Sequence, residues 1–286
     1  KIGDDLRQDQ LIMQLITLMD NLMQQVGLDL RITPYRILAC GRNEGFLQFV
    51  NNSKPFEAII QKRTIRAWLE RKSKGDVRKY QEACDNFVRS CAGYCIITYI
   101  LGIGDRHLDN LMLTTDGKMF HIDFGFILGR DPKRFAPPMK LCKEMVEGMG
   151  GSNSPGYIRF LEYCCTAYNI MRRNSHWILN MFILMVDAGI KDIDEGVRKN
   201  IADDNSGNNG DAELHLDKIL ENARNKLGEA RMEDFKNIME VQARLKLELN
   251  DEEATKCITE VIKGSEQALF SSLHDYTHRL AQKWRN

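Results

Sequence analysis

The residues best suited to chemistry lie in one stretch, residues 102–125, with the sequence G-I-G-D-R-H-L-D-N-L-M-L-T-T-D-G-K-M-F-H-I-D-F-G. It contains an acid, an imidazole and an amide as Asp105, His107 and Asn110, and a second acid, Asp123, further along the chain. Phosphoryl transfer needs such groups, because Mg²⁺ prefers hard oxygen ligands and the acceptor hydroxyl must give up its proton. We therefore predict that Asn110 and Asp123 hold a divalent cation, Mg²⁺ or Mn²⁺.

Two short apolar runs join these polar clusters, and Asp116-Gly117 lies between the runs. This dipeptide predicts a two-residue β-hairpin, because a type I′ turn needs positive φ at both central positions. A tight hairpin brings its two ends together. We therefore expect Asn110, just before the first strand, to lie close to Asp123, just after the second.

The order of the motif residues resembles that of a known family. Protein kinases carry H-R-D-x-x-x-x-N followed by D-F-G, and Asp105 precedes Asn110 by the same spacing. The His follows the Asp here, as D-R-H, which resembles the phosphatidylinositol 3-/4-kinase superfamily. G-D-D-L-R-Q-D at residues 3–9 resembles a second signature of that superfamily. After D-F-G, the runs G-R-D-P-K, P-P-M-K-L and K-E-M-V-E-G-M-G-G resemble the class III, or vacuolar-sorting, phosphatidylinositol 3-kinases more closely than other members.

The resemblance implies an α+β, mostly helical fold of the two-lobed protein-kinase type, with an incomplete N-terminal lobe and a large helical C-terminal lobe. Residues 1–50 would form the partial N-terminal lobe and the hinge, and residues 51–286 the C-terminal lobe. The larger lobe would contain a catalytic loop at 102–110, an activation loop at 123–150, an insertion at 195–235 and a C-terminal amphipathic helix at 265–285. Apolar residues recurring at helical spacing also predict helices over about 6–26, 56–101, 157–173 and 176–188.

The resemblance also assigns roles to single residues. His107 would be the general base, because a neutral imidazole has a pKa near working pH, and Asp105 would orient the acceptor or act as base itself. Arg106 would pair structurally within the catalytic loop. Lys1 would contact the phosphates of ATP, although the pattern alone favours a solvated terminal lysine beside an acidic cap. The remaining residues expected around the nucleotide are Asp4, Asp9, Tyr35, Gln48, Phe49 and Val50.

The loop after D-F-G carries the expected lipid specificity. It would recognise the inositol head group through Arg130, Lys133, Arg134 and Lys140, and so few cations suit a substrate without ring phosphates. The resemblance thus implies transfer of the γ-phosphate of ATP to the 3-hydroxyl of phosphatidylinositol, giving phosphatidylinositol 3-phosphate for endosomal or vacuolar sorting and autophagy. Two alternatives stay open: a catalytically incomplete docking module, and a phosphatidylinositol 4-kinase or related large protein kinase.

Composition limits the possible partners. The 286 residues carry 40 basic and 40 acidic side chains, and this balance argues against nucleic acid as a partner. No apolar run reaches the ~20 residues of a spanning helix, and the eight cysteines suit reduced thiols in a cytosolic protein. The resemblance implies a cytoplasmic enzyme, peripheral on endosomal, vacuolar or autophagic membranes, with a protein-kinase-like regulatory subunit and further complex subunits. The apolar stripe of the C-terminal helix would contact either the membrane or the kinase core.

Overall fold

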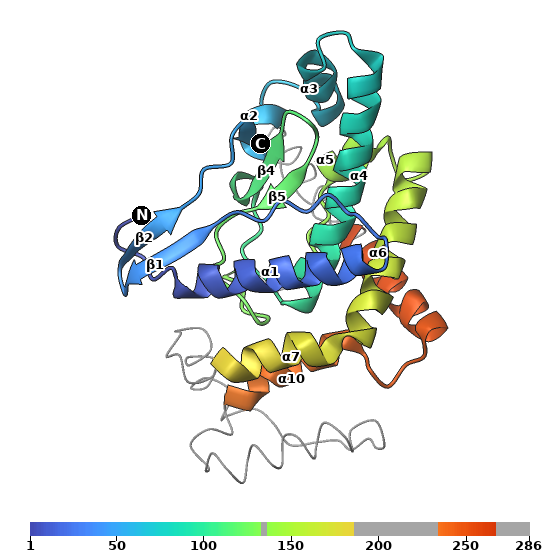
Figure 1. Cartoon of the computed structure of the whole chain (residues 1–286). Coiled ribbons are helices and arrows are strands. Elements are labelled where there is room, and N and C mark those ends of the chain that lie inside the picture. Colours follow the sequence, from blue (N-terminus) through green and yellow to red (C-terminus); the bar gives the residue numbers. More distant parts are fainter. Residues whose placement is uncertain (133–135, 186–233, 267–286) are drawn as a thin grey trace, which may run out of the picture.

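The computed structural model of the chain describes residues 1–132, 136–185 and 234–266 (Figure 1). In chain order its elements are α1 (Arg7–Gln25), β1 (Ile37–Gly41), β2 (Glu44–Leu47), β3 (Ser53–Pro55), α2 (Phe56–Ile60), α3 (Ile65–Lys72), α4 (Val77–Ile100), the 3₁₀ turn η1 (Leu108–Asn110), β4 (Leu111–Thr114), β5 (Met119–His121), α5 (Lys143–Met149), α6 (Pro155–Arg173), α7 (Ser175–Met185) and α10 (Asp234–Leu245). Residues 251–266 are also helical.

The N-terminal part combines α1 with the antiparallel hairpin of β1 and β2. Ile37 pairs with Leu47 in this hairpin, and α1 packs against β1 (Figure 1). Leu11, Leu15 and Met19, spaced by four residues, are almost completely buried, because side chains at this spacing share one face of a helix. The helix predicted over 6–26 is confirmed to within one residue at each end.

A three-stranded antiparallel sheet in the order β3-β4-β5 precedes the D-F-G sequence. Leu111 pairs with His121 and Leu113 with Met119. The predicted hairpin is therefore confirmed, and it connects the expected catalytic loop to D-F-G.

The turn of this hairpin is not the predicted type I′ turn. A type I′ turn would need positive φ at both Asp116 and Gly117, but of these two residues only Gly117 has a positive φ, +89°. The N–H of Gly117 donates to the carbonyl of Thr114 at 2.9 Å. This is the three-residue loop in which a type I turn precedes a left-handed residue. Glycine is required there, because a Cβ on Gly117 would lie 1.9 Å from the carbonyl oxygen of Ala83 in α4.

Helix α4 forms the centre of the helical part, with α6 and β5 packed against it (Figure 1). Asp76 caps its start, with its carboxylate accepting from the N–H groups of Arg78 and Lys79. From Phe87 to Ile100 nearly every side chain is buried, as expected for the apolar sequence of this segment. The helix leads directly into the expected catalytic loop, residues 102–110, so the core of the domain fixes where that segment begins.

The described residues are mostly helical with two small sheets, which confirms the α+β class. The span expected as an activation loop, 123–150, ends in helix α5, which stops at Gly150 with a φ of +107°. The expected C-terminal helix lies outside the described residues except for 265 and 266, and the expected insertion is described only at 234 and 235, where α10 begins. Within the described ranges, no helix combines the length and apolarity required to span a bilayer.

Candidate active site

The structure brings Asn110 and Asp123 together at the open end of the β4–β5 hairpin. Asn110 ends η1 and immediately precedes β4. Its carbonyl oxygen accepts a hydrogen bond from the N–H of Ile122 at 3.1 Å. Pairing therefore continues one step beyond the two strands, and it fixes Asn110 beside the residue that precedes Asp123.

Local bonds orient the side-chain oxygens of this pair. Asn110 Nδ2 donates to the carbonyl of Asp105 at 3.0 Å, so the amide oxygen is the group suited to a metal. Asp123 is exposed and has a left-handed φ of +61°, a conformation that costs on the order of 1–3 kcal/mol and is common at functional sites. Its Oδ1 accepts from the N–H of Gly125 at 3.2 Å. The amide oxygen of Asn110 and the carboxylate of Asp123 are both hard oxygen ligands, so this pair suits Mg²⁺.

Asp105 and His107 lie in the loop that leads to Asn110. His107 Nε2 is 3.8 Å from Asp105 Oδ2, and the two side chains are 43% and 28% exposed. Asp105 has a φ of +51°, and its N–H donates to Asp131 Oδ2 at 2.9 Å. Both side chains are thus accessible in one cluster, and this geometry is compatible with either group as the base.

Arg106 joins the catalytic loop to the hairpin end. Its buried guanidinium donates to the carbonyls of Gly104 at 2.6 Å and Ile122 at 2.9 Å, and also to the carbonyl of Asp123. Burial lowers the pKa of Arg106 to about 10, against the attraction of Asp123 and Asp105. The side chain therefore holds backbone in place and has a structural role.

Helix α1 holds the D-F-G backbone from the other side. Asp9 Oδ1 accepts from the N–H of Phe124 at 3.0 Å, and Gln8 Nε2 donates to the carbonyl of Phe124 at 2.7 Å. Burial raises the pKa of Asp9, the negative charge of Asp123 adds to this, and the Phe124 hydrogen bond opposes it. Asp9, which was expected around the nucleotide, thus positions the residue next to Asp123.

Lys1 pairs with an acid beside the site. Its Nζ lies 2.7 Å from Asp4 Oδ2. Partial burial acts to lower the pKa of Lys1, but the bond to Asp4 and the charges of Asp123 and Asp9 outweigh burial and raise it. Its ammonium therefore lies in the electrostatic field of Asp123, the predicted cation ligand.

Tyr35 lies beneath this cluster. It is buried, with its ring edge-on to Phe120 at 6.2 Å between centroids. Burial and the nearby charge of Asp9 raise the pKa of its hydroxyl, which has no hydrogen-bond partner among the described residues. Buried polar groups normally find a partner, so this hydroxyl is an exception among the described residues, within the field of Asp9, Arg106 and Asp123.

The expected hinge residues connect β2 to β3, between the two sheets. Gln48 exchanges two hydrogen bonds with the backbone of Arg36, at 2.8 and 3.0 Å. The carbonyl of Val50 accepts from Ser53 Oγ at 2.7 Å, whereas the side chain of Phe49 is 76% exposed. The connection is thus fixed at both ends and exposes an aromatic ring between them.

Of the four cations expected at the lipid head group, Lys133 and Arg134 lie outside the described residues. Arg130 is half-buried and its carbonyl packs against the catalytic loop, where a Cβ on Gly104 would lie 2.1 Å from it. Lys140 is also half-buried. Its carbonyl accepts from Cys95 Sγ at 3.4 Å.

Three supporting residues were not singled out from the sequence: Gln8, Asp131 and Arg244. Asp131 bonds to the N–H of Asp105 as described above. A neighbouring backbone hydrogen bond, from the N–H of Gly129 to the carbonyl of Gly102 at 2.9 Å, joins the same two loops. Arg244 of α10 reaches the carbonyl of Tyr99, at the end of α4, at 2.9 Å. The only local sign of Asp131 was its place in the run G-R-D-P. No local pattern marks Arg244, because its partner Tyr99 lies 145 positions away in the sequence.

A hairpin that joins an acid-imidazole loop to D-F-G, with a helix acid holding the D-F-G backbone, defines a catalytic domain of the kinase-like class. Comparison with known proteins gives the family. Residues 1–194 match the family described as phosphatidylinositol 3- and 4-kinase. The chain belongs to this family.

Individual relatives are similar over the whole chain. It is 44% identical over 288 residues to the phosphatidylinositol 3-kinase, root isoform, of Glycine max, and 44% identical over 294 residues to phosphatidylinositol 3-kinase pik3 of Schizosaccharomyces pombe. Identity to phosphatidylinositol 3-kinase VPS34 of Saccharomyces cerevisiae is 40% over 288 residues. These matches cover 100% of this chain but only 31%, 32% and 29% of the three relatives. The chain thus spans about a third of their length.

Proposed function

We propose that the chain is the catalytic part of a class III phosphatidylinositol 3-kinase, which transfers the γ-phosphate of ATP to the 3-hydroxyl of phosphatidylinositol. The observation that carries this proposal is the hydrogen bond from the N–H of Ile122 to the carbonyl of Asn110, which brings Asn110 and Asp123 to the same hairpin end, with Asp105 and His107 in the loop leading into it. Similarity over the whole chain to proteins named phosphatidylinositol 3-kinases supports the same reaction.

Asn110 Oδ1 and the Asp123 carboxylate would hold Mg²⁺ or Mn²⁺. When bound, the cation supplies positive charge that neutralises the phosphates of ATP. The other residues act on the position of these ligands. Arg106 holds the carbonyl of Asp123, and Asp9 holds the next N–H along the chain, so the carboxylate itself stays available.

The acceptor hydroxyl must lose its proton during transfer. We assign this to His107, since a neutral imidazole nitrogen can accept a proton and commonly acts as a general base. Asp105, 3.8 Å away, would orient the hydroxyl. Single-turnover transfer by the His107→Ala and Asp105→Ala variants tests this assignment, because loss of a base costs about 10²- to 10⁴-fold. Abolition by the Asp105 change alone would move the role of base to Asp105.

ATP would lie between a small N-terminal lobe, residues 1–50, and a helical lobe from residue 51 onward. Lys1 would contact its phosphates, and the segment from Gln48 to Val50 would contact the adenine. Isothermal titration with ATP, with and without Mg²⁺, tests this site. We expect binding that depends on Mg²⁺ in the wild type and loses that dependence in the Asp123→Ala variant.

The substrate would be phosphatidylinositol in a membrane, with Arg130, Lys133, Arg134 and Lys140 near its phosphodiester. The protein would act peripherally on endosomal, vacuolar or autophagic membranes, together with regulatory subunits. Separation of the lipid products distinguishes the members of the family. A 3-phosphate supports the proposal, whereas a 4-phosphate, or phosphorylation of a peptide offered beside the lipid, contradicts it.

A docking module without transfer activity is the second candidate. The β1–β2 hairpin and its flanks expose large apolar side chains, with Ile2 89%, Leu38 59%, Phe46 72% and Phe49 76% exposed. Apolar surface of this kind commonly marks contact with another protein or segment. Absence of ATP binding by the folded wild-type chain would favour this function over catalysis.

A further inference from the structure

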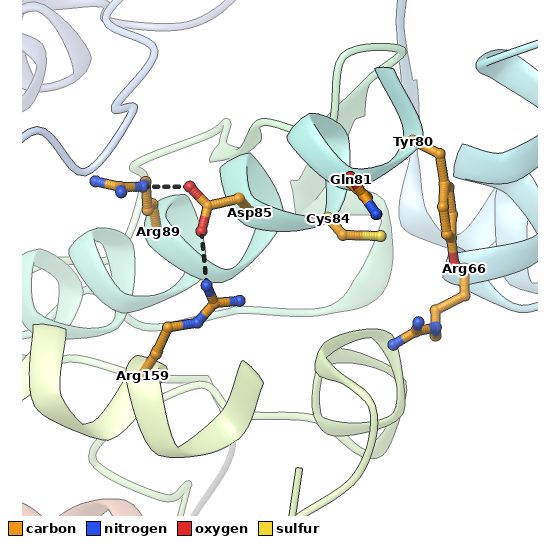
Figure 2. Close-up of a pocket in the computed structure, with 7 residues that line it drawn as sticks. All are labelled: Arg66, Tyr80, Gln81, Cys84, Asp85, Arg89 and Arg159. Carbon is orange, nitrogen blue, oxygen red and sulfur yellow. Dashed lines mark hydrogen bonds and ion pairs between the residues drawn. The ribbon is translucent and has the colours of Figure 1, made fainter. Parts of the chain in front are cut away.

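A pocket near the start of α4 contains polar groups that the proposed reaction does not use. It lies between α3, α4 and α6 (Figure 2), has a volume of about 560 Å³ and is lined, within the described part of the chain, by Arg66, Tyr80, Gln81, Cys84, Asp85, Arg89 and Arg159. The helix rises by about 1.5 Å per residue, so Asp85 lies roughly 22 Å along α4 from Ile100 and the catalytic loop.

The lining carries more positive than negative charge. Figure 2 shows Asp85 in contact with two arginines: Arg89 Nε donates to Asp85 Oδ2 at 2.6 Å, and Arg159 Nη1 lies 3.5 Å from Asp85 Oδ1. Arg66 adds a third guanidinium. One carboxylate is therefore shared by two cations, and the described lining has a net charge of about +2.

Arg89 is held in place by several contacts, whereas Arg159 and Arg66 are exposed. Arg89 is fixed, because it also donates to the carbonyl of Asp29 at 3.0 Å and lies 5.1 Å from the ring centre of Tyr163. Arg159 is 51% exposed, and one long contact cannot satisfy its five N–H donors. Arg66 is exposed on α3, and its guanidinium faces the same space from the opposite side (Figure 2).

We propose that this pocket binds a small phosphate-bearing anion, free in solution or as a lipid head group, between Arg66 and Arg159. The planar fork of arginine matches two oxygens of one phosphate. The volume lies in the range of small-molecule sites, so the pocket has room for a ligand larger than a single phosphate. Gln81 would bond to a hydroxyl group of that ligand, whereas the hydroxyl of Tyr80 already interacts with Cys84 and Arg66.

Isothermal titration of the full chain with inorganic pyrophosphate and with a soluble inositol trisphosphate tests binding of a free anion. Flotation with phosphatidylcholine vesicles, with and without a phosphatidylinositol phosphate, tests a lipid head group. Arg66→Gln and Arg159→Gln should each weaken binding at least tenfold. The matched control, Arg71→Gln on the exposed last turn of α3, should change it less than twofold, and Asp85→Asn should strengthen it.

Binding of the soluble probes alone identifies a free anion, and binding of the phosphoinositide vesicles alone identifies a lipid. Either result supports the proposed pocket if the Arg66→Gln and Arg159→Gln variants lose that binding. No binding by the wild type, or the same affinity in the Arg159→Gln and Arg71→Gln variants, would overturn the proposal. Thermal melting followed by circular dichroism establishes whether each variant is folded. If Arg159→Gln is not folded, the Arg66→Gln variant alone is used for the test.

Discussion

Replacement of Asp131 by alanine should slow catalysis with little effect on folding. Its carboxylate bonds to the N–H of Asp105 at 2.9 Å, and Asp105 has a left-handed φ of +51° that needs support from its surroundings. A hydrogen bond to a charged group contributes about 1.5–3 kcal/mol. Because Asp131 is half-buried, we take the lower part of this range, roughly 1.5–2 kcal/mol.

That energy holds the catalytic loop in one position, so its loss should appear in the rate of transfer. At 1.36 kcal/mol per factor of ten, kcat should fall about 10- to 30-fold. The KM for ATP should change about twofold at most, because the bond from Asp131 supports the loop that carries the proposed base. Steady-state transfer at varied ATP and lipid concentrations separates the two constants.

Two matched variants make this test specific. Asp131→Asn keeps a carbonyl oxygen in the same place and should recover activity to within about threefold of the wild type, since the acceptor of the Asp105 N–H is retained. Glu147→Ala removes an exposed acid that pairs with Lys143 at 3.5 Å and should leave kcat unchanged. An unchanged kcat in Asp131→Ala, or an asparagine variant as slow as the alanine variant, would refute the positioning role.

Three further predictions concern stability, measured by thermal unfolding. Gly117→Ala should lower Tm more than Gly75→Ala. Both glycines have a positive φ, but only a Cβ on Gly117 would clash with the α4 backbone, at 1.9 Å from the carbonyl oxygen of Ala83. Equal decreases in Tm would exclude this clash. Burial raises the pKa of Asp20 to about 6, so its destabilising charge develops as pH rises through 6. Asp20→Asn should therefore raise Tm at pH 7.5 but hardly at pH 4, whereas the exposed control Glu82→Gln should show no such dependence. Asp123→Asn should remove the rise in Tm that Mg²⁺ with ATP gives the wild type, and an equal rise in the variant would exclude Asp123 as a ligand.

The hairpin and the central helix could be predicted from the sequence because their signals are local. Asp116-Gly117 fixes a turn whatever surrounds it, and the apolar run from Phe87 onward requires burial. The turn type depends instead on tertiary contact. Asn86 Nδ2 donates to the carbonyl of Asp116 at 2.9 Å, and the α4 backbone leaves no room for a side chain at Gly117.

The supports of the site could not be predicted in the same way, because they connect distant parts of the chain. Asp9 and Phe124 are 115 positions apart, and Arg244 and Tyr99 are 145 apart. None of these contacts leaves a periodic pattern or a turn signal. The sequence therefore indicated the groups that could act on a substrate and also Arg106 and Asp9 near them, but not the backbone groups that these two residues hold.

These supports share one feature that bears on function. Arg106 binds the carbonyl of Asp123, Asp9 binds the N–H of Phe124, and Asp131 binds the N–H of Asp105, so each acts on backbone. A support that paired with the Asp123 carboxylate would stabilise the apo protein but compete with a cation. Because the backbone carries the stabilising contacts, Asp123 keeps its charge available beside Asp9, whose carboxylate repels it. This arrangement favours a bound cation over the empty site, as phosphoryl transfer requires.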